Sequence, residues 1–179
     1  MHGGNRLASN SLIEAVVYAD AAAKHSLKVV DQYAYNEAIQ QKSIAQQNAD
    51  KQKIENEAAI AKAEADKQVA IDLLDTLKAN EAGCVGMAAN MIGVKKRIIA
   101  VNMGLFNIAM FNPKIVKRTG AYETEEGCLS LDGVRSCRRY QEIEVEYQDM
   151  NFKKQRQKYT GWTAQIIQHE VDHCHGIVI

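Results

Sequence analysis

The residues best suited to chemistry lie near the end of the chain, where His169, Glu170 and His173 form the pattern H-E-x-x-H. On a helix, residues four apart share one face, so both imidazoles can bind one metal ion and Glu170 can reach a water molecule on it. The alternative is a solvated polar helix with two chance histidines, which so short a motif does not exclude. Neighbouring apolar residues indicate partial burial, where unpaired histidines and acids are costly. The motif therefore predicts a mononuclear metal-hydrolase site with Glu170 as the acid/base.

A third ligand is expected, because catalytic sites of the zinc type commonly use three protein ligands and keep one position open for water. Cys128 is the preferred candidate, since it lies in the tight, partly polar segment E-E-G-C-L-S, where a strand could present both a thiolate and a backbone N–H. A buried packing thiol is the alternative for this residue. Cys174 and His175 would point away from the helix face that carries His173, so we expect Cys174 in the core.

The other cysteines are expected to be reduced. Four occur in the chain, at positions 84, 128, 137 and 174, and none forms a C-x-x-C pair. The first ten residues lack a basic segment followed by an apolar one, so we expect no secretory signal and a cytoplasmic location. Without export, a disulfide framework is disfavoured, and Cys84 and Cys137 are assigned to packing.

The composition is that of a globular protein, with 46% hydrophobic and 25% charged residues among 179. Lysine plus arginine and aspartate plus glutamate both number 22, so the formal net charge is zero. No global electrostatic argument therefore favours nucleic acid or a membrane surface as a partner. The apolar runs are far shorter than the roughly 18 residues that a membrane span requires.

Two regions of different composition are expected to position the site. Residues 11–80 are dominated by alanine, glutamine, lysine and glutamate, which favour helix, and residues 1–65 are predicted to be a helical N-terminal extension. Residues 43–65 contain few large apolar residues, so a helix there is expected to be exposed, paired with a partner or poorly ordered. We see no sustained heptad. Residues 58–77 are predicted to form one helix. Six residues would lie near one face of it: Ile60, Ala63, Lys67, Ala70, Ile71 and Leu74.

From Gly83 onward the pattern changes to short β-rich stretches, some with the alternation of half-buried strands. Residues 149–151 suit a hairpin turn, and Pro113 is predicted to separate two strands. The last segment reads as a helix capped by Thr160 or Thr163 and ended by Gly176. The predicted fold is α+β, with antiparallel sheets packed around the H-E-x-x-H helix. The predicted strands cover residues 97–103, 108–112, 115–117, 134–140, 143–148 and 152–159.

Three segments, in this order, resemble the signature motifs of the peptide deformylases: GCVGMAANMIG at 83–93, EGCLS at 126–130 and QHEVDH at 168–173. The resemblance covers residues 66–179 and is to the compact bacterial type, which gives a catalytic domain preceded by the unmatched residues 1–65. It implies an amidohydrolase that removes the N-formyl group from the initiator methionine of nascent proteins. N-formylmethionyl peptides, including those of nascent chains at the ribosome, would be its partners, with no specific nucleic acid and no membrane.

The resemblance also implies roles for individual residues. Cys128, His169 and His173 would bind one divalent metal ion, Fe²⁺ in the cell, with Ni²⁺, Co²⁺ or Zn²⁺ able to replace it. Glu170 would move the proton, and the Leu129 N–H would donate to the developing oxyanion. The implied substrate contacts are Gly86, Met91, Glu126 and Arg135. Asp172 is expected to support the site by pairing with Arg138 or Arg139.

The first motif departs from the family pattern, because Cys84, Met87 and Met91 stand where glycine, leucine and glutamine are usual. A thioether cannot donate the hydrogen bond that the glutamine amide would give. Its loss would lower turnover by about two to three orders of magnitude. Asn90 could compensate only if the backbone turned it inward, which alternation disfavours.

Other functions therefore remain open beside an active deformylase. One is a weakened, deformylase-like metal-binding protein, and another is a helical interaction module on a metal-stabilised domain. A metalloprotease would share H-E-x-x-H but would not predict the other two segments. The basic stretch at residues 152–158 is compatible with ribosome contact, although a solvated strand face is the preferred interpretation.

Overall fold

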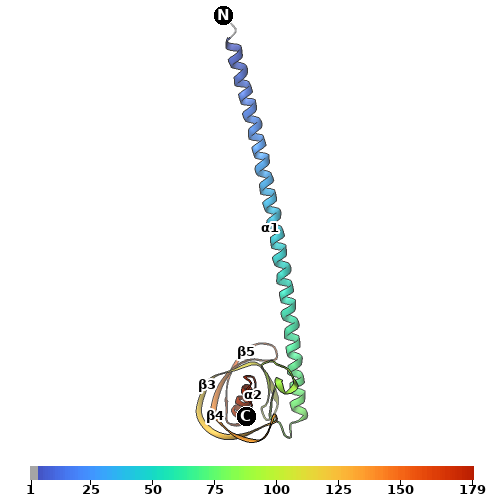
Figure 1. Ribbon diagram of the computed structural model, residues 1–179, viewed down its shortest axis with the longest axis vertical. Helices are drawn as coiled ribbons and strands as arrows, with labels where there is room; N and C mark the ends of the chain where they lie inside the picture. The colour runs from blue at the N-terminus through green and yellow to red at the C-terminus, as the bar shows by residue number, and fades with distance from the viewer. Residues whose placement is uncertain (1–3) are drawn as a thin grey trace. The chain divides into compact units, whose positions relative to one another are not determined.

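A computed structural model describes residues 4–179, with side chains described from Ser11 onward (Figure 1). One compact unit ends at Ala59, and the other is Ile60–Ile179. The domain boundary predicted after residue 65 stays a prediction. No helix among the described residues is both long and apolar enough to cross a membrane.

Helix α1 spans Gly4–Ala79 and owes its length to a sequence with no proline and no interior glycine. Polar side chains four residues apart support it, as in the pair of Lys24 Nζ and Asp20 Oδ2 at 2.7 Å. Its side chains from residue 11 to residue 60 are exposed, including Leu12, Val16 and Val30. These residues contribute nothing to the hydrophobic core that holds the site.

The last turns of α1 bury Ala70, Leu73 and Leu77 completely, against a cluster that includes Phe111. The predicted apolar face was wrong in part, because Ile60 and Ile71 are 59% and 41% exposed. Leucines at positions i and i+4, rather than the isoleucines, meet the sheet. Several faces of this helix carry apolar residues, and the packing partner decides which face is buried.

The sheet has five antiparallel strands in the order of the sequence, β1-β2-β3-β4-β5, and it curves around helix α2 (Figure 1). A short 3-10 helix, η1 at Ala89–Ile92, follows the first strand. Successive strands pair with their neighbours, so every connection within the sheet is local. The strands are β1 Gly86–Ala88, β2 Ile98–Asn102, β3 Asn107–Cys128, β4 Leu131–Gln148 and β5 Lys154–Thr160.

Strand β3 passes through Pro113 without a break, so the predicted separation into two strands was wrong. The register with β4 shifts between Phe111 and Lys114, and Asn112 has a positive φ of 51°. Such an irregularity accommodates a residue that has no N–H to give to the ladder. The Pro113 carbonyl instead accepts a hydrogen bond from Arg97 at 2.8 Å.

The predicted turn at residues 149–151 is confirmed, because Asp149 Oδ1 accepts hydrogen bonds from the backbone N–H of Asn151 and Lys153. This turn joins β4 to β5, and β5 leads directly into α2, Gly161–His173. Thr160 takes the N-cap position without a side-chain cap bond, and Gly176, at a φ of 77°, follows the end of the helix as predicted.

Helix α2 packs its apolar face against the sheet through Ala164, Ile166, Ile167 and Val171. Trp162, at the start of the helix, lies outside this face and is 61% exposed. Burial of the apolar face fixes the rotation of α2, and this rotation turns its polar residues toward the end of β3. The predicted α+β fold, an antiparallel sheet around the H-E-x-x-H helix, is therefore confirmed.

Candidate metal centre and active site

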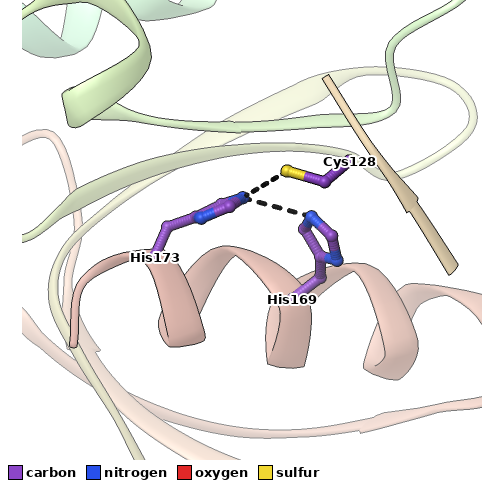
Figure 2. A group of neighbouring side chains, drawn as sticks. All are labelled: Cys128, His169 and His173. Atoms are coloured by element: carbon purple, nitrogen blue, oxygen red, sulfur yellow. Dashed lines mark hydrogen bonds between the residues drawn. The ribbon is translucent and has the colours of Figure 1, made fainter. Parts of the chain in front are cut away.

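Cys128, His169 and His173 converge on one point, as Figure 2 shows. Cys128 Sγ lies 3.4 Å from His173 Nε2, and His173 Nε2 lies 3.1 Å from His169 Nε2. The cysteine comes from the end of β3 and the histidines come from successive turns of α2. The structure thus brings together the three residues that the sequence proposed as ligands.

The separations of these atoms fit a metal ion. Metal–nitrogen bonds of about 2.0–2.1 Å and a metal–sulfur bond of about 2.3 Å place tetrahedral ligand atoms about 3.3–3.6 Å apart. The observed 3.4 Å and 3.1 Å lie near this range. A thiolate and two imidazoles are also a donor set that such ions accept.

A buried carboxylate sets the tautomer of His169. Glu126 Oε2 lies 2.8 Å from His169 Nδ1, and because an ionised carboxylate only accepts, Nδ1 carries a proton and donates it. The same hydrogen bond raises the pKa of His169 to about 9. The Nε2 atom of His169 faces the Nε2 atom of His173 at 3.1 Å, where a proton or a cation can lie between the two nitrogens.

Glu126 is itself held by a network beneath the site. Arg139 donates two hydrogen bonds of 2.8 Å to its oxygens, and Gln165 donates one of 3.0 Å. Burial raises the pKa of Glu126, but the hydrogen bonds from Arg139 and His169 outweigh it and lower the pKa to about 2. Arg139 also pairs with Asp172 at 2.6 Å, as one of the two predicted partners.

Glu170 lies beside the ligands with only 5% of its surface exposed. Its Oε2 atom is buried without a hydrogen-bond partner among the described residues. Burial raises the pKa of Glu170 to about 7, which suits a group that accepts and returns a proton near neutrality. Burial also lowers the pKa of His173 and so favours the neutral imidazole that a metal needs.

Gly86 leaves space for the Glu170 side chain because it has no side chain of its own. A methyl group at Gly86 would lie 2.6 Å from Ile166 Cγ2 and 2.7 Å from Glu170 Oε1, which real side chains do not tolerate. The small residues of the segment 83–93 therefore let the β1 backbone approach α2 closely. The close approach at Gly86 is to Glu170, and the implied contact of Gly86 with substrate stays a prediction.

A cavity of about 430 Å³ opens over these groups. It contains the predicted residues Gly86, Met91, Glu126, Cys128, Leu129, His169, Glu170 and His173 in its lining. Arg135 is not part of this lining; it is exposed on β4 and donates to the Asp132 carbonyl at 3.3 Å. Its contact with substrate stays a prediction.

Met91 lines the cavity on the wall opposite α2, where it contacts Ser130. The Ser130 hydroxyl donates to Met91 Sδ at 3.1 Å, while Asn90 is exposed and does not line the cavity. Sequence reasoning missed Gln165, which donates a hydrogen bond to Glu126. The spacing of Gln165 and His169 on one helix face was the available signal for Gln165.

Two histidines and a cysteine around a cavity, with a buried glutamate beside them, define the metal-dependent hydrolase class of site. The family model described as polypeptide deformylase matches residues 39–179. The chain belongs to this family.

Relatives agree with this assignment. The peptide deformylase of Clostridium beijerinckii is 57% identical over 114 residues, which are 64% of this chain and 84% of that protein. The peptide deformylase of Dictyoglomus turgidum is 39% identical over 114 residues, 63% of this chain and 73% of that protein.

Solved structures agree as well. The peptide deformylase of Thermotoga maritima has a TM-score of 0.59 at 28% identity, covering 64% of this chain and 78% of that one. The enzyme of the Vibrio parahaemolyticus bacteriophage VP16T, in complex with actinonin, has a TM-score of 0.57 at 35% identity, covering 63% and 82%. The predicted family and the predicted enzyme class, a peptide deformylase, are confirmed.

Proposed function

We propose that this chain removes the formyl group from N-formylmethionyl peptides at the cavity over Cys128, His169 and His173. The observation that carries the proposal is the convergence of these three ligand atoms, all within 4.8 Å of one another, beside the buried Glu170. The donor set and the proton-transfer group thus stand together, as hydrolysis of a formamide requires.

A divalent ion held by Cys128, His169 and His173 would supply Lewis acidity and lower the pKa of water. Glu170 accepts the proton of the attacking water and passes it to the methionine nitrogen as the C–N bond breaks. Its pKa of about 7 lets it act in both directions. The Leu129 N–H, next to the cysteine on the cavity wall, donates to the carbonyl oxygen as negative charge develops there.

Fe²⁺ is the proposed physiological ion, with Ni²⁺, Co²⁺ and Zn²⁺ as substitutes. One thiolate and two neutral imidazoles would leave a single positive charge on the site. Glu126 supports this set by fixing His169, so we propose for it a positioning role rather than contact with substrate.

Formylated ends of nascent chains in the cytoplasm are the proposed substrates. Nucleic acid is not proposed as a partner, because Arg156 and Lys158 of β5 are paired with acids of β4. Arg156 lies 3.0 Å from Glu144, and Lys158 lies 3.6 Å from Glu142. Paired charges of this kind make a solvated strand face.

A second role is proposed for the extension, as a helical interaction segment in addition to the enzyme. Its apolar side chains, such as Leu12, Val16 and Val30, are exposed along α1. Large exposed apolar side chains in a helix are often sites of association. Self-association measured by sedimentation, lost after removal of residues 1–59, would support this role, and a monomer that captures no partner would contradict it.

The test of the enzyme is formate release from formyl-Met-Ala, with protein purified anaerobically and its metal content measured. We expect one metal per chain and turnover that the Glu170→Ala variant reduces by at least about a hundredfold while it retains the metal. Glu64→Ala, on the exposed part of α1, is the matched control and should behave as the unchanged protein. Metal binding without formate release would reduce the chain to a metal-binding relative.

A further inference from the structure

We propose that Tyr122, acting through Gln165, is a positioning residue for the Glu126 carboxylate. Glu126 in turn orients the proposed ligand His169. The inference rests on the ligand set of the proposed function and adds to it a residue that lies outside the cavity. Its support is a chain of hydrogen bonds that runs from Tyr122 to His169.

Strand β3 and helix α2 place the members of this chain in two facing rows. Tyr122, Glu126 and Cys128 are separated by even numbers of residues, so they lie on one face of the strand. Glu126 and Cys128 are buried and Tyr122 is half-buried, whereas the odd-numbered residues between them are exposed. On α2, Gln165 and His169 are four residues apart and share one face of the helix. The backbones of the two elements therefore interleave these side chains.

The Gln165 amide joins the two rows. Tyr122 Oη donates to Gln165 Oε1 at 2.9 Å, and Gln165 Nε2 donates to Glu126 Oε1 at 3.0 Å. An ionised carboxylate only accepts, so the amide nitrogen faces Glu126 and the amide oxygen is left for the tyrosine. Because both ends of the amide are bound, the glutamine side chain is held in place. Hydrogen bonds in such a chain polarise one another, so the tyrosine strengthens the donor that reaches Glu126.

Gln165 completes the hydrogen bonding of the Glu126 carboxylate. Arg139 donates one hydrogen bond to each carboxylate oxygen, and His169 donates a second one to Oε2. The Gln165 amide is the second donor to Oε1. Both oxygens are thus held from two sides, which fixes the plane of the carboxylate. Loss of the amide would leave Oε1 with Arg139 alone and let the carboxylate turn relative to the His169 ring.

The contact between Tyr122 and Gln165 also lies between two pockets. Gln165 lines both the cavity over the proposed ligands and a neighbouring pocket beside the start of α2. Tyr122 lines only the neighbouring pocket, and Glu126 lines only the cavity. The hydrogen bond from the tyrosine therefore keeps Gln165 between Glu126 and the water of the neighbouring pocket. Without it, water can compete for the carboxylate oxygen.

The experiment measures metal affinity and needs no turnover. The Co²⁺-loaded full chain is titrated with a chelator and followed by its visible absorption. The variants are Tyr122→Phe, which removes only the hydroxyl, Gln165→Met, which removes the amide at similar length, and the pair. We expect Gln165→Met to weaken Co²⁺ binding about tenfold and Tyr122→Phe about three- to tenfold. The pair should match Gln165→Met within about twofold, because Tyr122 acts only through the amide.

Tyr147→Phe is the matched control, since the Tyr147 hydroxyl also donates to a glutamine, Gln157, at 3.0 Å. This pair joins β4 to β5 and lines neither of the two pockets. The Tyr147 hydroxyl also accepts a hydrogen bond from Tyr159, so the melting temperature of the control should fall at least as far as that of Tyr122→Phe. Its Co²⁺ affinity should stay within about twofold.

Three outcomes would overturn the proposal. Equal weakening of Co²⁺ binding in Tyr122→Phe and Tyr147→Phe would make the effect one of general stability. Unchanged affinity in Tyr122→Phe would show that its hydroxyl positions nothing. Additive losses in the pair would show that Tyr122 does not act through Gln165.

Formate release from formyl-Met-Ala by the same proteins separates this inference from the proposed function. At saturating Co²⁺, Tyr122→Phe should keep KM within about twofold, because Tyr122 does not line the cavity. If the unchanged protein releases no formate but the variants show the expected affinities, the proposed function fails and the role of Tyr122 stands. If formate is released but Tyr122→Phe binds Co²⁺ as the unchanged protein does, the inference fails and the proposed function stands.

Discussion

The imidazole of His169 donates its Nδ1 proton to Glu126 across 2.8 Å, in a part of the protein where Glu126 is only 8% exposed. This contact joins strand β3 to helix α2 within three residues of the end of the strand, where Cys128 lies. It orients the ring so that Nε2 faces the other two ligand atoms. The position of the proposed metal ligands thus depends on a carboxylate outside the proposed ligand set.

Replacement of Glu126 by glutamine should weaken metal binding by about tenfold to a hundredfold, because the amide no longer enforces the tautomer of His169. Competition with a chelator measures this affinity. Glu123→Gln is the control, since Glu123 pairs with Arg138 on the exposed side of the hairpin. Equal affinities for the two variants would show that Glu126 does not position the ligand.

Stability in acid should also depend on Glu126. Its pKa is lowered in the folded state to about 2, from an ordinary 4.5, so it stabilises the fold above about pH 4.5 and this contribution is lost as the pH falls toward 2. The shift corresponds to a contribution on the order of 3 kcal/mol.

Denaturant unfolding of the metal-free protein between pH 6 and pH 3 tests this. The free energy of unfolding should fall less steeply for Glu126→Gln than for the unchanged protein, from a lower starting value. Parallel pH profiles for the two proteins would contradict the assignment of the lowered pKa to this residue.

The sequence predicted the part of the site that local geometry determines. Two histidines four residues apart share one helix face whatever surrounds them, so His169 and His173 could be predicted from spacing. Cys128 was the preferred third ligand because of its tight, partly polar segment, and the resemblance to a family strengthened that choice, since its 45-residue separation from His173 leaves no local pattern. The strands were predicted from alternation, but the predicted segments 134–140 and 143–148 are one strand, β4, and residues 118–128 of β3 were not predicted as strand.

Contacts between distant residues could not be read in the same way. Arg139 pairs with both Glu126 and Asp172, although the register partner of Glu126 in the sheet is Arg135. The twist of the hairpin decides which arginine reaches inward. Pro113 shows the same limitation, since a bulge in the pairing of β3 with β4 keeps the strand continuous where the residue type predicts a break.

Removal of residues 1–59 should leave the metal site intact. The fully buried core residues begin at Ala70, and the chain up to residue 59 exposes every side chain that the structure describes there. We expect one metal per chain and a melting temperature within a few degrees of the full chain. Loss of cooperative unfolding in the shortened protein would show that the predicted extension is part of the folding unit.

Gly86→Ala provides the sharpest test of the approach between β1 and Glu170. Its new methyl group would meet Ile166 and Glu170 at 2.6 and 2.7 Å, so the strand or the helix must move. We expect a loss of about 1–3 kcal/mol in the free energy of unfolding. Turnover should fall further than the loss of folded protein explains, because the displaced group is the proposed acid/base, Glu170.

Gly83→Ala is the matched control for this substitution. Gly83 lines the same cavity, yet a methyl group there has no atom within 4 Å. Because glycine restricts the unfolded chain least, alanine at this open position should be neutral or stabilise the fold by less than about 1 kcal/mol. If both variants lost turnover equally at equal metal content, the flexibility of the glycine segment would set the rate. The space that Gly86 leaves for the Glu170 side chain would then not be the cause. If only Gly86→Ala lost it, the reason is that Glu170 needs a neighbour without a side chain.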